Sequence, residues 1–187
     1  MTLDRTGNLL GALALVIADR TTDAVDEAAG SSESAAAALS ALLHFLDGPS
    51  VDLLRQVLGL TSSGTVRLVD RLAEAGYVRR GPGRDGRSTS VTLTAPGRRA
   101  AQRIGAARAD VLNDSLGVLS AAERQEFEAL MGKVLAGLIR GPGAVRWLCR
   151  MCDTTACGRD EGQCPVASAV QERGYAPSTT NSAWDVR

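Results

Sequence analysis

The stretch from residue 51 to residue 76 holds two short helix signals separated by only a few residues, an arrangement that few folds accept. Residues 51–58 predict a helix that ends at Gly59. A second helix begins at Thr61 or Ser62, either of which can cap it, and runs to about Ala75. Because the connection GLTS is so short, the two helices are predicted to form a helix-turn-helix.

A β-hairpin is predicted directly after the second helix. The run YVRR at 77–80 is β-prone, and the turn GPGRDGR at 81–87 contains three glycines and a proline. The segment STSVTLT at 88–94 then alternates in the manner of a half-buried strand. A hairpin that follows a helix-turn-helix is a wing, and the polar tip of this one carries Arg84 and Arg87.

Helices are predicted on both sides of this lobe. Residues 8–28 and 33–46 place apolar side chains at spacings of three and four, which indicates helices with an apolar face. Residues 95–116 predict a long helix capped by Thr94, and a capping box opens the strongest helix pattern of the chain at 120–140. The predicted fold class is mainly α with a small β-wing.

The net charge of the 187 residues is zero, but it is unevenly distributed. Residues 1–50 carry 2 basic and 7 acidic side chains, residues 51–103 carry 10 and 4, and residues 104–187 carry 9 and 10. Of the 21 basic residues, 20 are Arg, which makes forked contacts with phosphate and guanine. The basic middle block coincides with the predicted winged lobe and indicates a surface that binds a polyanion.

The segment LVDRLAEAGYVRRGPGRDGRSTSVTLTAPGR, at residues 68–98, resembles the MarR family of winged-helix transcriptional regulators. The most specific matches are DRLxxAGYVxR, the DGR wing tip and LTxxGR, and the order of helices extends the likeness over roughly residues 8–140. In that family the terminal helices intertwine to form a dimer, and two recognition helices enter successive major grooves of a pseudo-palindromic site. The resemblance therefore implies a homodimer that binds a double-stranded DNA operator, as a repressor.

On the second helix of the helix-turn-helix, Val66, Val69 and Leu72 are predicted to face the core. The polar side chains between them are then left for the major groove and its edges, where hydroxyl groups and guanidinium groups contact bases and phosphates. The wing arginines resemble the minor-groove and phosphate contacts of the family. The predicted DNA-binding residues are Ser62, Ser63, Thr65, Arg67, Arg71, Arg84 and Arg87.

The predicted organisation has four parts. Residues 1–47 form N-terminal dimerisation and core helices, residues 48–100 the winged helix-turn-helix lobe, residues 101–141 the C-terminal dimerisation helices, and residues 142–187 a cysteine-rich extension with a loose tail. No run of 18 apolar residues and no signal peptide pattern is present, which predicts a cytoplasmic protein. The sequence contains no dinucleotide fingerprint, no P-loop and no nucleophile with its base, so it is not predicted to be an enzyme.

All four cysteines of the chain lie within 16 residues, at Cys149, Cys152, Cys157 and Cys164, and Pro165 follows the last. In a reducing cytoplasm such clustering favours a metal site over disulfides. Four thiolates suit either an iron–sulfur cluster or zinc. The single loop that closes on Cys-Pro favours a [4Fe-4S] cluster, with zinc as the alternative, and neighbouring arginines would offset the charge of the thiolates.

Three regulatory hypotheses follow from this pattern. In the first, the cluster senses redox state or iron, and its loss shifts the dimer helices and the spacing of the recognition helices. In the second, zinc is a structural staple and a small effector binds at the dimer seam, although the single histidine, His44, and the six aromatic residues supply few groups for such a pocket. His44 is predicted to lie in the core or the dimer seam. In the third, from another class, the chain is an iron–sulfur redox protein that uses its winged helix for protein contacts.

Overall fold

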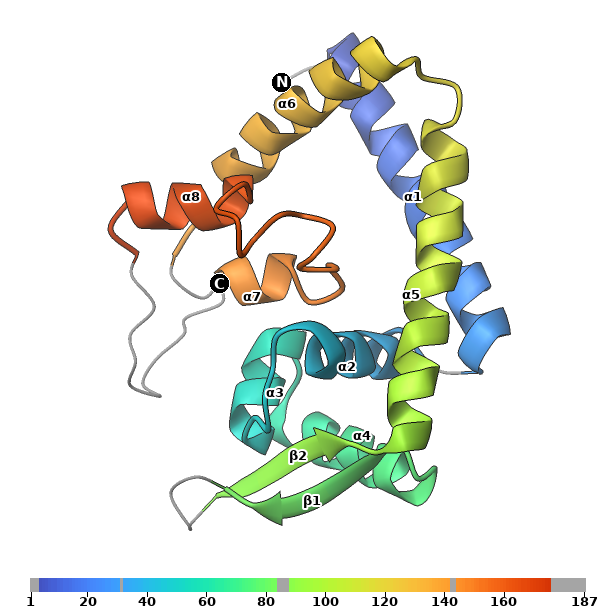
Figure 1. Cartoon of the computed structure of the whole chain (residues 1–187), viewed down its shortest axis with the longest axis vertical. Helices are drawn as coiled ribbons and strands as arrows, with labels where there is room; N and C mark the ends of the chain where they lie inside the picture. The colour runs from blue at the N-terminus through green and yellow to red at the C-terminus, as the bar shows by residue number, and fades with distance from the viewer. Residues whose placement is uncertain (1–3, 31, 84–87, 142–143, 176–187) are drawn as a thin grey trace.

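The computed structural model describes residues 4–30, 32–83, 88–141 and 144–175 of the chain. It confirms a mainly helical fold with a two-stranded wing (Figure 1). In chain order the elements are α1 (Arg5–Ala29), α2 (Glu33–His44), α3 (Val51–Leu58), α4 (Ser62–Glu74), β1 (Val78–Pro82), β2 (Thr89–Leu93), α5 (Ala95–Leu116), α6 (Ala121–Gly137), α7 (Ala144–Leu148) and α8 (Pro165–Glu172). None of the described helices is long and apolar enough to cross a membrane.

The helix-turn-helix is set by its caps, as the sequence predicts. The Ser50 hydroxyl accepts a hydrogen bond from the Leu53 N–H and starts α3. Gly59 ends α3 in the left-handed region, at φ 65°, a conformation that costs glycine little. The Thr61 hydroxyl then accepts from the Gly64 N–H and starts α4 only two residues later. The turn between the helices is therefore fixed by local chemistry.

The wing is an antiparallel pair in which Val78 lies opposite Leu93 and Pro82 opposite Thr89. Its second strand is held to the lobe by a hydrogen bond from the Val91 N–H to the Pro49 carbonyl, 2.9 Å long. The buried side chains of Val78 and Val91 extend the core beneath the strands. The predicted wing tip, with Arg84 and Arg87, lies outside the described residues.

One core joins the winged lobe to the helices that flank it. It runs from Val25 near the end of α1 to Ile104 in α5, and it contains the fully buried Leu39, Leu54 and Leu68. The alanines of α2 are almost all buried, which lets α2 lie close against α5. The predicted boundary between the N-terminal helices and the winged lobe therefore does not separate two cores, because residues on both sides of it pack in the same one.

Two long helices carry apolar side chains that nothing covers in the single chain. No residue of α6 is buried, and α1 buries only Val25. Figure 1 shows α1 lying along α5 and α6 sloping away from their shared end. The exposed large apolar residues on these helices and just beyond α6 are Leu9, Leu10, Leu13, Leu15, Val16, Leu130, Met131, Val134, Leu135 and Leu138.

The C-terminal extension has a small core of its own. Ile139, at the end of the α6 segment, packs with Cys149 and Cys164 and with apolar residues of α8, namely Val166, Ala169 and Val170. Helix α8 lies on α6, and the chain between them turns back so that α7 contacts α3 of the winged lobe (Figure 1). The extension thus bridges the C-terminal helix and the helix-turn-helix.

A glycine pair in α5 tests the packing between this helix and the wing. A methyl group added at Gly97 would overlap the Tyr77 carbonyl at the start of the wing, so we expect Gly97→Ala to lower the free energy of unfolding by about 2–3 kcal/mol. Nothing lies within 4 Å of a methyl group added at Gly105, about two helical turns further along α5. Gly105→Ala should therefore raise stability by about 0.5–1 kcal/mol through helix propensity. Urea denaturation followed by circular dichroism measures both, and equal effects would contradict the close contact.

Candidate nucleic-acid interface and cysteine site

Helix α4 faces the core through residues that differ in part from those predicted. Thr65, Leu68, Val69 and Leu72 are buried, which is the i, i+3, i+4, i+7 spacing of one helix face. The Thr65 hydroxyl donates a hydrogen bond to the Thr61 carbonyl, 3.0 Å away, and has no exposed surface. The prediction that Thr65 contacts DNA is therefore wrong. Val66, which was expected to face the core, is 43% exposed.

The other four predicted residues of α4 lie on its open side. Ser62, Ser63, Arg67 and Arg71 are all exposed. Ser63, Arg67 and Arg71 recur at spacings of four, which aligns them along the helix, and Ser62 lies beside Ser63 in its first turn. Val66 lies among them. The open face of α4 therefore combines two hydroxyl groups, two guanidinium groups and one apolar side chain, a set suited to base edges and phosphates.

Two arginines that the sequence reasoning did not select extend this face onto the wing. Arg80 on β1 forms an ion pair of 2.7 Å with Asp70 of α4, which places its guanidinium beside the recognition helix. The neighbouring Arg79 donates from Nε to the Thr92 hydroxyl across the strands, 3.1 Å away. Both side chains are exposed. The YVRR run was the signal in the sequence. It places two arginines on the strand that directly follows the basic helix α4, so their side chains can lie beside that helix.

The four cysteines lie together in the extension as two thiol pairs. Cys149 and Cys164 are buried, while Cys152 and Cys157 are half-buried. The hydrogen bond with Cys152, followed by burial, raises the pKa of Cys149, and the same hydrogen bond lowers the pKa of Cys152. Burial and the neighbouring Cys164 raise the pKa of Cys157. Among the described residues, no three side chains of His, Cys, Asp and Glu are set to enclose an ion.

Arginines from separate parts of the chain surround the thiols. The pKa of Cys152 is lowered, after its hydrogen bond with Cys149, by the charges of Arg108, Arg159 and Arg150. Arg108 comes from α5, whereas Arg150 and Arg159 belong to the cysteine loop. These positive charges favour the thiolate of Cys152 and offset its charge.

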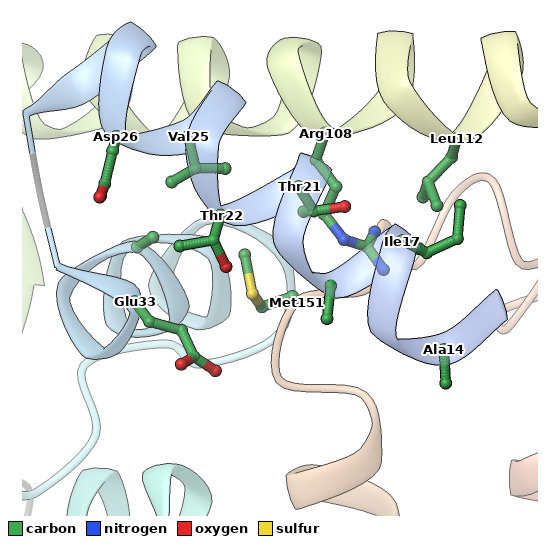
Figure 2. A pocket seen from close by; sticks show the side chains of 12 residues that line it. Ala14, Ile17, Thr21, Thr22, Val25, Asp26, Glu33, Arg108, Leu112 and Met151 are labelled. Carbon is green, nitrogen blue, oxygen red and sulfur yellow. The ribbon is translucent and has the colours of Figure 1, made fainter. Parts of the chain in front are cut away.

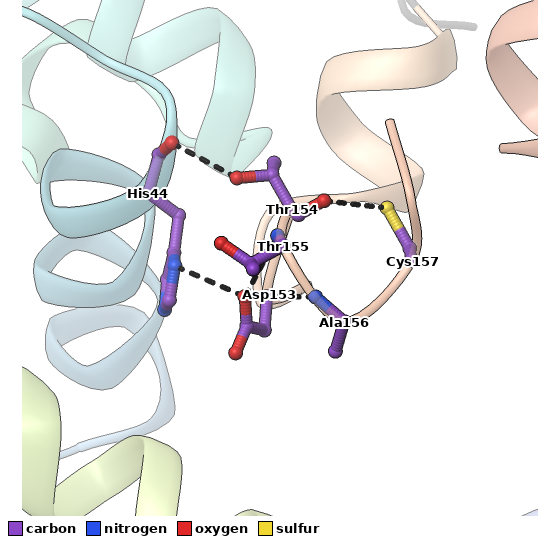
Figure 3. Close-up of polar contacts among 6 residues, drawn as sticks. All are labelled: His44, Asp153, Thr154, Thr155, Ala156 and Cys157. Carbon is purple, nitrogen blue, oxygen red and sulfur yellow. Dashed lines mark hydrogen bonds and ion pairs between the residues drawn. The ribbon is translucent and has the colours of Figure 1, made fainter. Parts of the chain in front are cut away.

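The cysteine loop docks on the end of α2 through polar contacts. The Thr154 hydroxyl donates to the His44 carbonyl, 3.2 Å away, and the Asp153 carboxylate lies 3.7 Å from His44 Nδ1 (Figure 3). The same carboxylate accepts from the N–H groups of Thr155 and Ala156, which holds the loop in a turn. His44 is thus a docking residue for the extension, a role that its predicted place in the core or dimer seam did not include.

The aromatic and apolar residues of the extension reach further into the lobe. The Trp147 indole lies against the turn of the helix-turn-helix, where a methyl group added at Gly59 would be 3.5 Å from its Nε1. Arg150 stacks over the same indole, 4.8 Å from the ring centre, and its guanidinium lies 3.8 Å from the Glu33 carboxylate of α2. Met151, between two of the cysteines, packs against the main core.

Met151 also lines a cavity of about 300 Å³ between α1, α2 and α5. Figure 2 shows its side chain and that of Arg108 among residues of α1, with Ile17 and Thr22 on one wall and Glu33 opposite. The Thr21 hydroxyl on the same wall is buried without a hydrogen-bond partner. The cavity therefore combines the Arg108 guanidinium, the Asp26 and Glu33 carboxylates and one unused hydroxyl with apolar walls.

The geometry of α3, α4 and the hairpin is that of a winged helix-turn-helix protein. Residues 30–88 match the sequence model described as the MarR family, so the winged-helix domain of this chain belongs to that family. Proteins of the MarR family are transcription regulators rather than enzymes. No curated protein matches the chain by sequence.

Solved structures of MarR-family proteins have the same fold. MepR, a transcription regulator of the Staphylococcus aureus multidrug efflux pump MepA, superposes with a TM-score of 0.61 at 17% identity, over 70% of this chain and 96% of its own. A Mycobacterium tuberculosis MarR-family protein in complex with p-aminosalicylic acid gives 0.55 at 26% identity, over 70% and 98%. Escherichia coli MarR in its apo form gives 0.56 at 24% identity, over 67% and 96%. The four-cysteine extension is not part of what the family match covers.

Substitution at Met151 tests whether the extension is held by apolar contact with the core. Met151→Ser removes about 1 kcal/mol of apolar burial, so we expect trypsin to cut after Arg150 and Arg159 roughly fivefold faster. Thr155→Ala changes an exposed side chain of the same loop and should leave the cleavage rate unchanged. Equal rates for wild type and Met151→Ser would mean that the loop is held by its polar contacts alone.

Proposed function

We propose that this chain is a homodimeric, sequence-specific DNA-binding regulator that represses transcription from a pseudo-palindromic operator. The observation that carries the proposal is the open face of α4, where Ser62, Ser63, Arg67 and Arg71 are exposed beside Arg80 of the wing. A recognition helix of this composition fits the major groove, because hydroxyl groups and guanidinium groups reach both phosphates and base edges. The +6 charge of residues 51–103 supports the same partner.

The uncovered apolar faces of α1 and α6 support the dimer. Ten large apolar residues stand exposed on or next to these two helices, and a second copy of the chain offers the same surface in return. An isologous contact of this kind sets the distance between two α4 helices. Binding to a palindrome then requires that distance to match about one helical turn of DNA, or roughly 34–36 Å.

Substitution of Arg67 tests the DNA interface. Arg67→Ala removes a guanidinium from the middle of the α4 face, so we expect operator affinity to fall about tenfold and the salt dependence to weaken by about one counterion. Arg140→Ala removes an exposed arginine beyond α6 and serves as the matched control. Fluorescence anisotropy with an operator duplex, at several salt concentrations, measures both. An unchanged affinity and slope for Arg67→Ala would reject this face.

We further propose that Cys149, Cys152, Cys157 and Cys164 hold a [4Fe-4S] cluster that makes the regulator responsive to redox state or iron. The donor set is all sulfur, and the surrounding Arg108, Arg150 and Arg159 suit an anionic cluster. All four cysteines lie in one short loop that closes on Cys-Pro, an arrangement that favours the wider ligand spacing of a cluster over a single zinc ion. A bound cluster would supply a redox-active centre at this point.

The contacts of the cysteine loop supply a route from that site to DNA binding. Trp147 contacts Gly59 in the helix-turn-helix. Thr154 and Asp153 form polar contacts with His44 at the end of α2. A change in the loop therefore acts on the winged lobe of its own chain as well as on the α6 helix behind it. This route is shorter than one that passes through the dimer helices.

Metal analysis of protein purified without oxygen tests the cysteine proposal. We expect about four iron and four sulfide per chain with a broad brown absorbance, and a loss of both in Cys157→Ser. Holo and apo protein should differ in operator affinity, and Trp147→Ala should reduce that difference while leaving the iron content unchanged. One zinc per chain without colour would replace the cluster with a structural metal that contributes folding energy.

The cavity between α1, α2 and α5 favours a second candidate, in which a small organic acid is the effector. Arg108 offers a cation for a carboxylate, and the Thr21 hydroxyl has no other partner. One neighbour in structure was solved with p-aminosalicylic acid. Operator release by that acid from the zinc or apo protein, absent in Arg108→Ala, would support effector sensing at this seam.

A further inference from the structure

Among the described residues of the winged lobe, 48–83 and 88–100, Val66 is the one large apolar side chain that stands exposed. The other exposed large apolar residues belong to α1, the α5–α6 turn, α6 and the start of the extension. Its neighbours in the helix, Thr65 and Leu68, are buried. The packing of the lobe therefore does not explain why Val66 is exposed.

The position of Val66 is the centre of the surface assigned to DNA. Ser62 lies one turn before it, and Arg67 follows it directly. One turn after it, Asp70 is held by Arg80 at 2.7 Å, so this carboxylate is neutralised and turned towards the wing. Val66 is also the fifth residue of α4, in the N-terminal half that enters the groove in proteins of this architecture.

A valine at this point offers neither a donor nor an acceptor, so it cannot read the hydrogen-bond pattern of a base pair. The 5-methyl group of thymine is the apolar feature of the major groove that such a side chain contacts. A β-branched residue in an exposed helix position also lowers helix stability slightly relative to alanine. An apolar contact with DNA would offset this loss.

We propose that Val66 is a specificity-determining residue that contacts the 5-methyl group of a thymine in each half-site of the operator. The inference rests on the proposed DNA-binding function and adds the base that this position selects. Ser62, Ser63 and Arg67 around it contribute hydrogen bonds. Val66 contributes discrimination between thymine and bases without a methyl group at one position per half-site.

The test uses the full-length wild-type protein and a duplex selected by it from a random pool. Each thymine of the selected half-sites is replaced in turn by deoxyuridine, which keeps the base pair and removes only the methyl group. We expect one thymine per half-site at which the exchange lowers wild-type affinity about fourfold, the effect of one buried methyl group. Val66→Ala should bind the thymine and uracil duplexes equally at that position.

Two results would overturn the assignment. Wild-type protein that tolerates deoxyuridine at every thymine makes no methyl contact, and a loss of equal size in Val66→Ala assigns the contact to another residue. Val118→Ala, which truncates a valine 86% exposed in the turn between α5 and α6, is the matched control and should keep the discrimination. Failure to select any duplex would instead reject the proposed function, and the Val66 assignment would fall with it.

Discussion

The close contact between α2 and α5 is the constraint on which the rest of the molecule depends. Four consecutive alanines, residues 35–38, are buried along with Leu39 and Ala41, and small side chains let α2 lie close to α5 at Ala100, Ala101 and Ile104. Helix α5 continues from the wing into the region of α1, so this one interior ties the helix-turn-helix to the helices with uncovered faces. The cysteine loop then docks on the C-terminal end of the same α2. A displacement of α2 would therefore alter its contacts with the helix-turn-helix, with the helices that have uncovered faces and with the cysteine loop.

Helix boundaries were predictable because they are set by local chemistry. Thr61, Thr94 and Ser120 each accept a backbone hydrogen bond at the start of a helix, and Gly59 ends one in the left-handed region. The capping box at Ser120 and Glu123 is complete, and the Ser120 hydrogen bonds lower the pKa of the Glu123 carboxyl. These signals act within three or four residues. The local sequence therefore contains all the residues that determine these helix ends.

The phase of α4 was predicted incorrectly because residue type competed with spacing. Taking Val66, Val69 and Leu72 as the core face follows the apolar residues, but steps of three drift around a helix. The observed face of Thr65, Leu68, Val69 and Leu72 has the correct period and includes a threonine whose hydroxyl is satisfied by the Thr61 carbonyl. Once that hydrogen bond is formed, burying a threonine costs little. The same shift exposes Val66.

The grouping of the cysteines was evident from their spacing, whereas their surroundings were not. Thr154 meets His44 across 110 residues of sequence, and Trp147 also meets Gly59 from far away in the chain. Contacts of this kind depend on how the chain turns back after α6, and no periodicity encodes them. Trp147, which comes soon after α6 in the sequence, lies on the helix-turn-helix. Arg108 likewise approaches Cys152 from α5, far away in sequence.

The contact of Trp147 with Gly59 has a mechanical meaning. Gly59 stands just ahead of the N-terminus of α4, and α4 has 13 residues, which makes it about 20 Å long. A rotation of about 5° around that end moves the far end of the helix by roughly 2 Å, which is several times the range of about 0.5 Å in hydrogen-bond length. The Trp147 indole therefore lies close to the N-terminal end of α4, and the rest of this helix carries side chains of the proposed DNA interface. A slight movement of the extension is enough to take base edges in or out of reach.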